Sequence, residues 1–381
     1  MTWLIILGVP LAAGAIWVLR GVYYLRKAKR LNAEADRLNA EAAASRARRA
    51  EIEAEQARAV VAQGFVAADD LDTEHRAPVP AEETAAVAAV TAGDWAAGAA
   101  WIEAAGQDWD ERDHRIRTLA EPAAEDDAWL LAWRAARPQD ATAAAVHADA
   151  SVLVAWNVRG SKSAKYTTDE QFRVFHQLLG SAQEAVHEAQ RLAGPADPVP
   201  YMLEQPIAMA LGYSHERYAQ LWEQIVTRGP KVVAAHTNAL QYWCRKWRGS
   251  HEEAESFAAK SAASGAPGDL LTLLPLTAYF ERETYESDLD PDVYYKEPHI
   301  VAAADAALAD LAAADPADPR AVRLRHMLAW ILYWQDRYEE ALEHFRAVDG
   351  CIGAVPWSYS GNPRSRYTKA RDYTVRQVTQ A

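Results

Sequence analysis

The chain begins with an uncharged, mostly apolar stretch and then changes abruptly to a charged pattern. Residues 3–19 read WLIILGVPLAAGAIWVL and contain no charge. Extended to Leu25, with the Arg20 side chain reaching for the interface, a helix of this length matches the thickness of a bilayer core. The pattern predicts a transmembrane helix over residues 1–26 that contacts the lipid bilayer through residues 3–25.

Two other interpretations fit this stretch less well. A cleaved signal peptide carries positive side chains before its apolar run, and here no such side chain precedes it. A buried core helix is not normally followed by a basic segment, whereas here the basic residues follow the run: Arg20, Arg26, Lys27, Lys29 and Arg30. The positive-inside rule then predicts a single-pass protein of the cell membrane, with its N-terminus outside and its C-terminal domain in the cytoplasm.

Residues 27–64 are rich in alanine, glutamate and arginine, with no glycine or proline before Gly64, and this composition predicts a helical stalk. A repeat of seven residues, RLNAEAD followed by RLNAEA, places Leu31 and Leu38 at one heptad position, which Ile52 shares further on. The core positions after Leu38 are otherwise small or polar. The stalk is therefore either a solvated single helix or a weak coiled coil that forms a homodimer.

Two segments lack a hydrophobic period. Residues 65–83 combine acidic residues with Pro78 and Pro80, a composition that predicts a flexible linker. Residues 356–381 contain five basic residues against one acidic residue, and Gly-Asn-Pro at 361–363 predicts a basic, irregular tail. Disorder, contact with the acidic part of the chain and contact with anionic lipid are three alternatives for this tail.

Residues 84–355 alternate apolar helical runs with turn residues, without a convincing alternating strand pattern. The clearest unit lies near the end, where Trp330, Tyr338, Ala341 and Phe345 follow the pattern of a tetratricopeptide repeat. The predicted fold class is therefore all-α. It comprises an N-terminal transmembrane helix and helical stalk, then a tetratricopeptide-like α-solenoid of about five or six helical pairs.

Two strings in this region are distinctive, YSHER at 213–217 and WRGSHEE at 247–253. With them, residues 84–290 resemble an uncharacterised family of membrane-anchored actinobacterial proteins with tetratricopeptide-like helical repeats. The resemblance implies a helical-repeat fold and no catalytic activity.

Charge and cysteine content narrow the classes of partner. The net charge is −13; residues 1–64 hold 10 basic and 6 acidic residues, a balance of +4, which leaves −17 on the remainder. Because an acidic body repels phosphate backbones, we expect no nucleic-acid partner. The two cysteines, Cys244 and Cys351, exclude a disulfide framework and fit a reducing compartment.

The histidines between residues 215 and 251 support one alternative function, a metal-dependent hydrolase that uses His and Glu side chains. The zinc-protease motif requires a second histidine four residues after His251, and residue 255 is Glu. A helix cap explains Ser250 and Glu253 without a metal. No GxGxxG, GxxxxGK[ST] or GxSxG string occurs. We therefore expect a protein without catalytic activity, metal or cofactor.

A binding surface follows from the geometry of tetratricopeptide units, whose first helices line a concave groove. Transferred to this chain, that geometry predicts a partner-binding groove formed by Arg323, His326, Trp330, Tyr333, Trp334, Thr237, Gln241 and Arg245. The alternative is that Trp330 and Trp334 pack beneath the following segment, because their helix is apolar nearly all round. The resulting hypothesis is a membrane-tethered scaffold or adaptor for an unknown cytoplasmic protein or peptide. A purely structural spacer is a further alternative.

Overall fold

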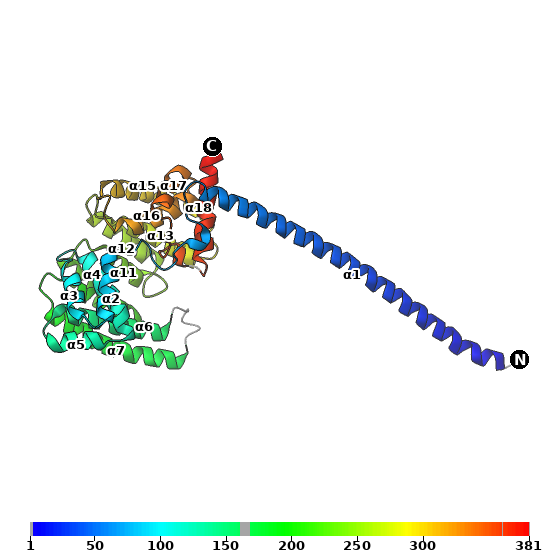
Figure 1. Ribbon diagram of the computed structural model, residues 1–381, viewed down its shortest axis with the longest axis horizontal. Helices are drawn as coiled ribbons and strands as arrows, with labels where there is room; N and C mark the ends of the chain where they lie inside the picture. Colours follow the sequence, from blue (N-terminus) through cyan, green and yellow to red (C-terminus); the bar gives the residue numbers. More distant parts are fainter. Residues whose placement is uncertain (1–2, 161–167, 360, 381) are drawn as a thin grey trace. The chain divides into compact units, whose positions relative to one another are not determined.

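The computed structural model describes residues 3–160, 168–359 and 361–380; the side chains of residues 3–16 and of Asp169 lie outside this description. The chain divides into two units, residues 1–67 and residues 68–381, and we call the second unit the body. Within the described ranges the regular elements are helices (Figure 1), which agrees with the all-α part of the prediction.

The first unit contains one continuous helix, α1 (Trp3–Val61), of 59 residues. At 1.5 Å per residue it is about 88 Å long. The predicted stalk is helical up to Val61, as its breaker-free composition indicated. Leu31 and Leu38 are 55% and 53% exposed in the single chain. The homodimer through these positions stays a prediction.

The predicted transmembrane helix over residues 1–26 is contradicted. In the described part of the chain, no helix combines the length and the apolar character needed to cross a membrane. Side chains are described from Trp17 onward, and from there the helix soon carries Arg20, Arg26 and the charged stalk. Charged side chains are costly in hydrocarbon, so this part of α1 is too polar for a span. Residues 3–16 of the predicted lipid contact lie outside the described side chains, and the expected cellular location stays a prediction.

The body consists of helices joined by short turns. Its longer helices are α2 (Ala81–Thr91), α3 (Trp95–Glu103), α4 (Trp109–Glu125), α5 (Ala128–Ala136), α6 (Ala141–Arg159), α7 (Asp169–Leu192), α10 (His215–Arg228), α11 (Val233–Trp243), α12 (His251–Ser264), α13 (Leu273–Tyr285), α15 (Pro298–Ala313), α16 (Ala321–Trp334), α17 (Tyr338–Val348) and α18 (Pro363–Gln380). Short helices are α8 (Val199–Met202), α9 (Gln205–Leu211), α14 (Pro291–Tyr294), and the 3₁₀ turns η1 (Ala68–Asp70) and η3 (Trp357–Tyr359).

Local side-chain caps explain where several helices begin. Thr168 and Gln171 form a reciprocal capping box at the start of α7. The hydroxyls of Ser214 and Ser250 accept backbone N–H groups three residues on, at the starts of α10 and α12. Asp94 does the same before α3. These starts were readable from sequence because each cap needs only residues within one turn.

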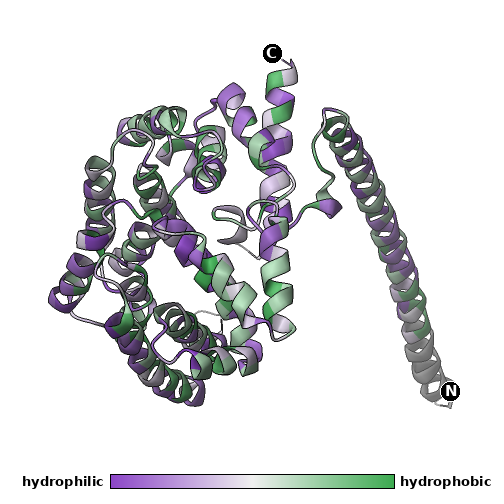
Figure 2. Cartoon of the chain, turned by 60° about the vertical axis from the view of Figure 1, so that its left-hand side comes forward, coloured by the Kyte–Doolittle hydropathy of each residue, from purple (hydrophilic) through white to green (hydrophobic). Residues whose placement is uncertain are grey.

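Consecutive helices pack as neighbouring pairs, with α6 against α7, α11 against α12 and α16 against α17. The short connections make the members of the last two pairs antiparallel, and Figure 2 shows the body as a curved array whose helices carry both hydrophilic and hydrophobic faces. Large buried aromatic side chains fill the interior. Tyr218 and Tyr242 stack with ring centroids 3.6 Å apart, and Trp133 and Trp357 are fully buried.

The segment before α2 is fixed to the C-terminal half of the body, where its composition predicted a flexible linker over residues 65–83. Asp72 exchanges backbone hydrogen bonds with Gly350 and Ile352, at 2.8 and 2.7 Å. Gly353 N–H donates to the His75 carbonyl at 2.8 Å, and Leu71 is buried. Backbone pairing with a distant segment overrides the local preference of an acidic, proline-containing sequence for disorder.

The predicted irregular tail over residues 356–381 is wrong, because residues 363–380 form the helix α18. Tyr367 of this helix is buried against Phe345 and Trp357, with ring centroids 5.6 and 5.0 Å apart. The Arg371 guanidinium is also buried and pairs with Asp349 at 3.1 Å. Of the three alternatives for the tail, the structure shows contact with the acidic body.

Candidate functional site

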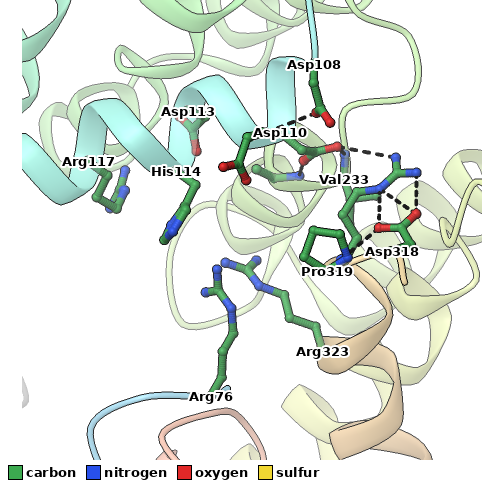
Figure 3. Close-up of a pocket in the computed structure, with 13 residues that line it drawn as sticks. Arg76, Asp108, Asp110, Asp113, His114, Arg117, Val233, Asp318, Pro319 and Arg323 are labelled. Carbon is green, nitrogen blue, oxygen red and sulfur yellow. Dashed lines mark hydrogen bonds and ion pairs between the residues drawn. The ribbon is translucent and has the colours of Figure 1, made fainter. Parts of the chain in front are cut away.

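One face of α4 turns charged side chains toward the interior of the body. Asp110, Asp113 and Arg117 lie at positions i, i+3 and i+7, which share a helix face. Together with Arg76 and Arg323 they line a cavity of about 110 Å³, which we call the arginine cavity (Figure 3). Its walls come from four parts of the chain: the segment before α2, α4, the start of α11 and the start of α16.

Asp110 holds these walls together. Its carboxylate accepts the backbone N–H groups of Val233 and Ala234 at 3.1 and 2.8 Å, in the first turn of α11. It also lies 3.6 Å from the Arg320 guanidinium just before α16, which pairs with Asp318 at 2.6 Å. A carboxylate at a helix N-terminus satisfies free N–H groups and interacts favourably with the helix dipole. The charges on this side of the cavity are therefore mutually satisfied.

Three arginines, Arg76, Arg117 and Arg323, line the other side of the cavity. In Figure 3 the side chains of Arg76 and Arg323 extend toward one another from the segment before α2 and from α16. Arg117 lies 3.7 Å from the carboxylate of Asp149 on α6. Among the described contacts, the guanidinium groups of Arg76 and Arg323 have neither a hydrogen bond nor an ion pair.

The pKa values in this cluster reflect crowding of charge in a largely buried place. Burial, reinforced by the positive charge of Arg76, lowers the pKa of Arg323 to about 10. Burial also lowers the pKa of Arg76, with Arg117 adding to the effect. Burial raises the pKa of Asp113 to about 6. The arginines remain charged at neutral pH. The carboxylates of Asp113 and Asp110 raise the pKa of Arg323, but among the described contacts neither forms an ion pair with it.

A second cavity, the central cavity, has a volume of about 280 Å³ and adjoins the first through Arg76 and Arg323. Thr237 and Gln241 of α11 line it, together with Met327 of α16 and residues of α13. Gln241 Nε2 donates to Glu281 Oε1 at 3.0 Å. The structure thus brings together three residues of the predicted groove, Thr237, Gln241 and Arg323, and their partner-binding role stays a prediction.

A third cavity, the tryptophan cavity, has a volume of about 450 Å³ and is mainly apolar. Trp156 and Trp247 meet edge to face there, with ring centroids 5.7 Å apart, and Leu153 and Met209 complete the apolar wall. It shares Arg117 with the arginine cavity, and Gln241 links it to the central cavity. Concave sites with apolar walls and a few polar groups are typical of ligand binding.

Two of the remaining predicted groove residues, His326 and Trp330, are buried in the body. His326 is fully buried: its Nδ1 accepts the N–H of Trp357 at 2.9 Å, so its Nε2–H donates to the Arg76 carbonyl at 3.0 Å. Trp330 is buried and donates to the Tyr295 hydroxyl at 3.3 Å.

Of the other predicted groove residues, Tyr333 contacts the last helix, α18, and Arg245 forms a surface ion pair. Tyr333 and Trp334 lie edge to face, and Tyr333 meets Tyr373 of α18, with ring centroids 5.9 Å apart. Arg245 pairs with Glu286 at 2.9 Å. α18, which the sequence did not predict, packs against α16 and α17 at this end of the body. The partner-binding role of these residues stays a prediction.

The three histidines considered for a metal site have separate partners. His215 Nε2 donates to the Arg248 carbonyl and His236 Nε2 to the Pro230 carbonyl, both at 2.9 Å. His251 Nε2 lies 3.0 Å from a carboxylate oxygen of Glu286. In the described part of the chain, no group of three or more His, Cys, Asp and Glu side chains could hold a metal ion. The arrangement gives the hydrolase alternative no support.

Comparison with protein-family models, curated proteins and solved structures found no match to this chain.

Sequence reasoning missed Arg76, Arg117, Trp156 and Trp247 as groups lining the cavities. Arg117 had no distinct local signal, because α4 carries charged side chains all round its first turns and nothing local separates the face of Asp110, Asp113 and Arg117 from the others. Arg76 had none either, since it lies in a segment whose composition predicts disorder.

Proposed function

We propose that the body is a helical-repeat scaffold or adaptor that binds a peptide segment of a partner protein in the three neighbouring cavities. The observation that carries the proposal is that these cavities share wall residues: Arg117, Gln241 and Arg323. A predicted membrane tether is not part of the proposal, because the helix on which it rested is contradicted.

The chemistry of the cavities fits a peptide better than a compact small molecule. The tryptophan cavity offers aromatic and aliphatic walls for an apolar side chain, as in the buried anchor pockets of protein interfaces. Gln241 lines both the tryptophan cavity and the central cavity, and Thr237 lines the central cavity, so polar groups are present there for peptide N–H and C=O groups. A bound peptide needs both kinds of contact, apolar walls for its side chains and polar partners for its backbone.

The purely structural spacer is less well supported. A spacer gains nothing from half-buried guanidinium groups that have no hydrogen bond or ion pair among the described contacts, because partly desolvating a charge costs free energy. Asp149 is also incompletely satisfied: it is 1% exposed, its carboxylate oxygens accept no hydrogen bond from the described groups, and its ion-pair partner Arg117 lies 3.7 Å away. Groups of this kind are expected where a ligand supplies the missing contacts.

Selection from a displayed library of random peptides on the full chain tests the proposal. Met209→Trp places a large ring in the tryptophan cavity, whereas Leu131→Trp adds the same ring at an exposed position of α5. We expect peptides enriched by the wild type to bind M209W about tenfold or more weakly, since a filled pocket excludes its anchor side chain, and to bind L131W unchanged.

Circular dichroism and thermal unfolding of both variants establish that they fold. A library from which no sequence is enriched, or peptides that bind M209W as tightly as the wild type, would contradict binding in this cavity.

A further inference from the structure

The arginine cavity has two unpaired cationic groups once its internal ion pairs are assigned. Asp318 pairs with Arg320, Asp110 holds the start of α11, and Glu111 pairs with Arg115 at 2.7 Å. The remaining partnered groups on this wall are Asp108, which caps α4, and His114, which lies 2.8 Å from Glu83. Arg117 faces Asp149, so Arg76, Arg323 and the buried Asp113 are left over.

The donors left over are well suited to an oxyanion. Guanidinium groups present N–H donors in a planar fork that matches the two oxygens of a carboxylate or phosphate. Arg76 and Arg323 both have this fork free among the described contacts, and Arg117 lies close enough for each of the three charges to affect another. Besides burial, the positive charges of Arg76 and Arg117 lower the pKa of Arg323, whereas the carboxylates of Asp113 and Asp110 raise it without forming an ion pair with it. An anion bound between the guanidinium groups relieves their mutual repulsion.

The size of the arginine cavity limits what it can hold. A volume of about 110 Å³ has room for several water molecules, and one carboxylate or phosphate group fits this space. Any larger ligand therefore extends into the central cavity past Arg323, or toward the segment of residues 74–80, which shares Arg76.

We propose that Arg76 and Arg323, supported by Arg117, bind an oxyanion, a carboxylate or phosphate group, in the arginine cavity. If the oxyanion belongs to a peptide, this inference rests on the proposed function. The same peptide then places an apolar side chain in the tryptophan cavity. One peptide would then place a negatively charged group between Arg76 and Arg323 and a bulky apolar side chain against Trp156 and Trp247.

Titration of the full chain with inorganic phosphate, and separately with acetate, tests the site without any peptide. Isothermal calorimetry against sodium chloride at matched ionic strength separates specific binding from screening. We expect saturable binding by the wild type and a loss of about tenfold or more in phosphate affinity for Arg323→Gln, which removes one charge-assisted pair. Arg325→Gln, two residues away on the same helix and outside the cavity lining, is the matched control and is expected to bind like the wild type.

Thermal unfolding without ligand adds a second measurement. If the arginine repels its neighbours in the free protein, R323Q unfolds at the same temperature as the wild type or higher, whereas a structural arginine would lower that temperature on removal. Arg76→Gln repeats both measurements on the other side of the cavity, so that misfolding of one variant leaves the other as the test. Equal phosphate affinity in R323Q, R76Q and the wild type would overturn the proposal, as would the absence of saturable binding of both anions.

Selected peptides with a free C-terminus, an amidated C-terminus or a phosphorylated side chain identify the source of the group. If the chain binds phosphate but selects no peptide, the result supports the oxyanion site and contradicts the proposed peptide binding. If selected peptides bind the wild type, R323Q and R76Q with equal affinity, the result contradicts the oxyanion site and supports the proposed peptide binding.

Discussion

The His326 imidazole joins the hydrophobic core to the arginine cavity. Its two ring nitrogens bond the Trp357 indole and the Arg76 carbonyl, which fixes the tautomer with the proton on Nε2. Burial lowers its pKa to about 4, so the ring is neutral at physiological pH. The sequence predicted that His326 lines a partner-binding groove. In the structure its Nε2–H instead donates to the backbone carbonyl of Arg76.

His344 of α17 is buried without such partners, and we expect its replacement to stabilise the protein. Neither ring nitrogen has a hydrogen-bond partner among the described groups, and burial lowers the pKa to about 4. Because an unpaired buried polar group costs free energy, His344→Leu is expected to raise the free energy of unfolding at pH 7 by about 1 kcal/mol.

The same substitution gives a pH dependence with a defined sign. In the wild type the unfolded state binds a proton near pH 6.5 and the folded state only near pH 4, so the folded state loses stability as the pH falls through this window. The advantage of H344L over the wild type should therefore grow by up to about 3 kcal/mol between pH 6.5 and pH 4. Urea unfolding of both proteins measures the difference, and parallel stability curves would contradict it.

α18 closes the C-terminal end of the body through a buried ion-pair cluster. Arg371 pairs with Asp349 of the loop after α17 at 3.1 Å and with Asp372 at 2.8 Å. Tyr367, one turn earlier, donates its hydroxyl to Asp349 at 2.9 Å. A basic segment without a clear hydrophobic period thus folds because it satisfies carboxylates and aromatic surfaces that only the completed body presents.

Removing one partner of this cluster should be far more damaging than removing an exposed charge nearby. Arg371→Leu removes the buried guanidinium that pairs with the carboxylates of Asp349 and Asp372, and we expect a loss of about 3–5 kcal/mol in the free energy of unfolding. Lys369→Leu, an exposed site on the same helix, should change it by less than about 0.5 kcal/mol. Urea unfolding followed by circular dichroism compares them; similar values for the two variants would show that the cluster does not stabilise α18.

The body depends on contacts between segments that are far apart along the chain. Asp110 of α4 bonds the start of α11 and approaches Arg320 before α16, and the arginine cavity lies among these elements. Burial raises the pKa of this carboxyl against the opposing effect of its hydrogen bonds. It therefore combines a desolvation cost with contacts that fix the spacing of three helices.

Asp110→Ala should loosen this junction without unfolding the body. Loss of the acceptor frees the N–H groups of Val233 and Ala234, and we expect a decrease of about 1–2 kcal/mol in the free energy of unfolding. Hydrogen exchange at the start of α11 should accelerate more than elsewhere. Asp288→Ala, at an exposed position, is the control. Unchanged exchange at Val233 and Ala234 would contradict this account of the junction.

Charge and composition were the least reliable guides to structure outside the predicted repeat region, in the N-terminal stretch and in residues 65–83 and 356–381. An apolar N-terminal stretch predicted a membrane span that the described part of α1 contradicts, because its residues from Trp17 onward soon become charged. Residues 65–83 and 356–381 had compositions typical of disorder. In both, partners distant in sequence supplied hydrogen bonds and buried surface that no local pattern contains.

Helix formation in the body and several helix starts, such as those at Thr168, Ser214 and Ser250, were readable from the residues alone. A cap or an apolar helix face involves side chains within one or two turns, so the information is local. The arginine cavity is of the opposite kind. Arg76, Arg117 and Arg323 belong to three separate segments, and they meet only because distant contacts such as those of Asp110 and His326 hold those segments together.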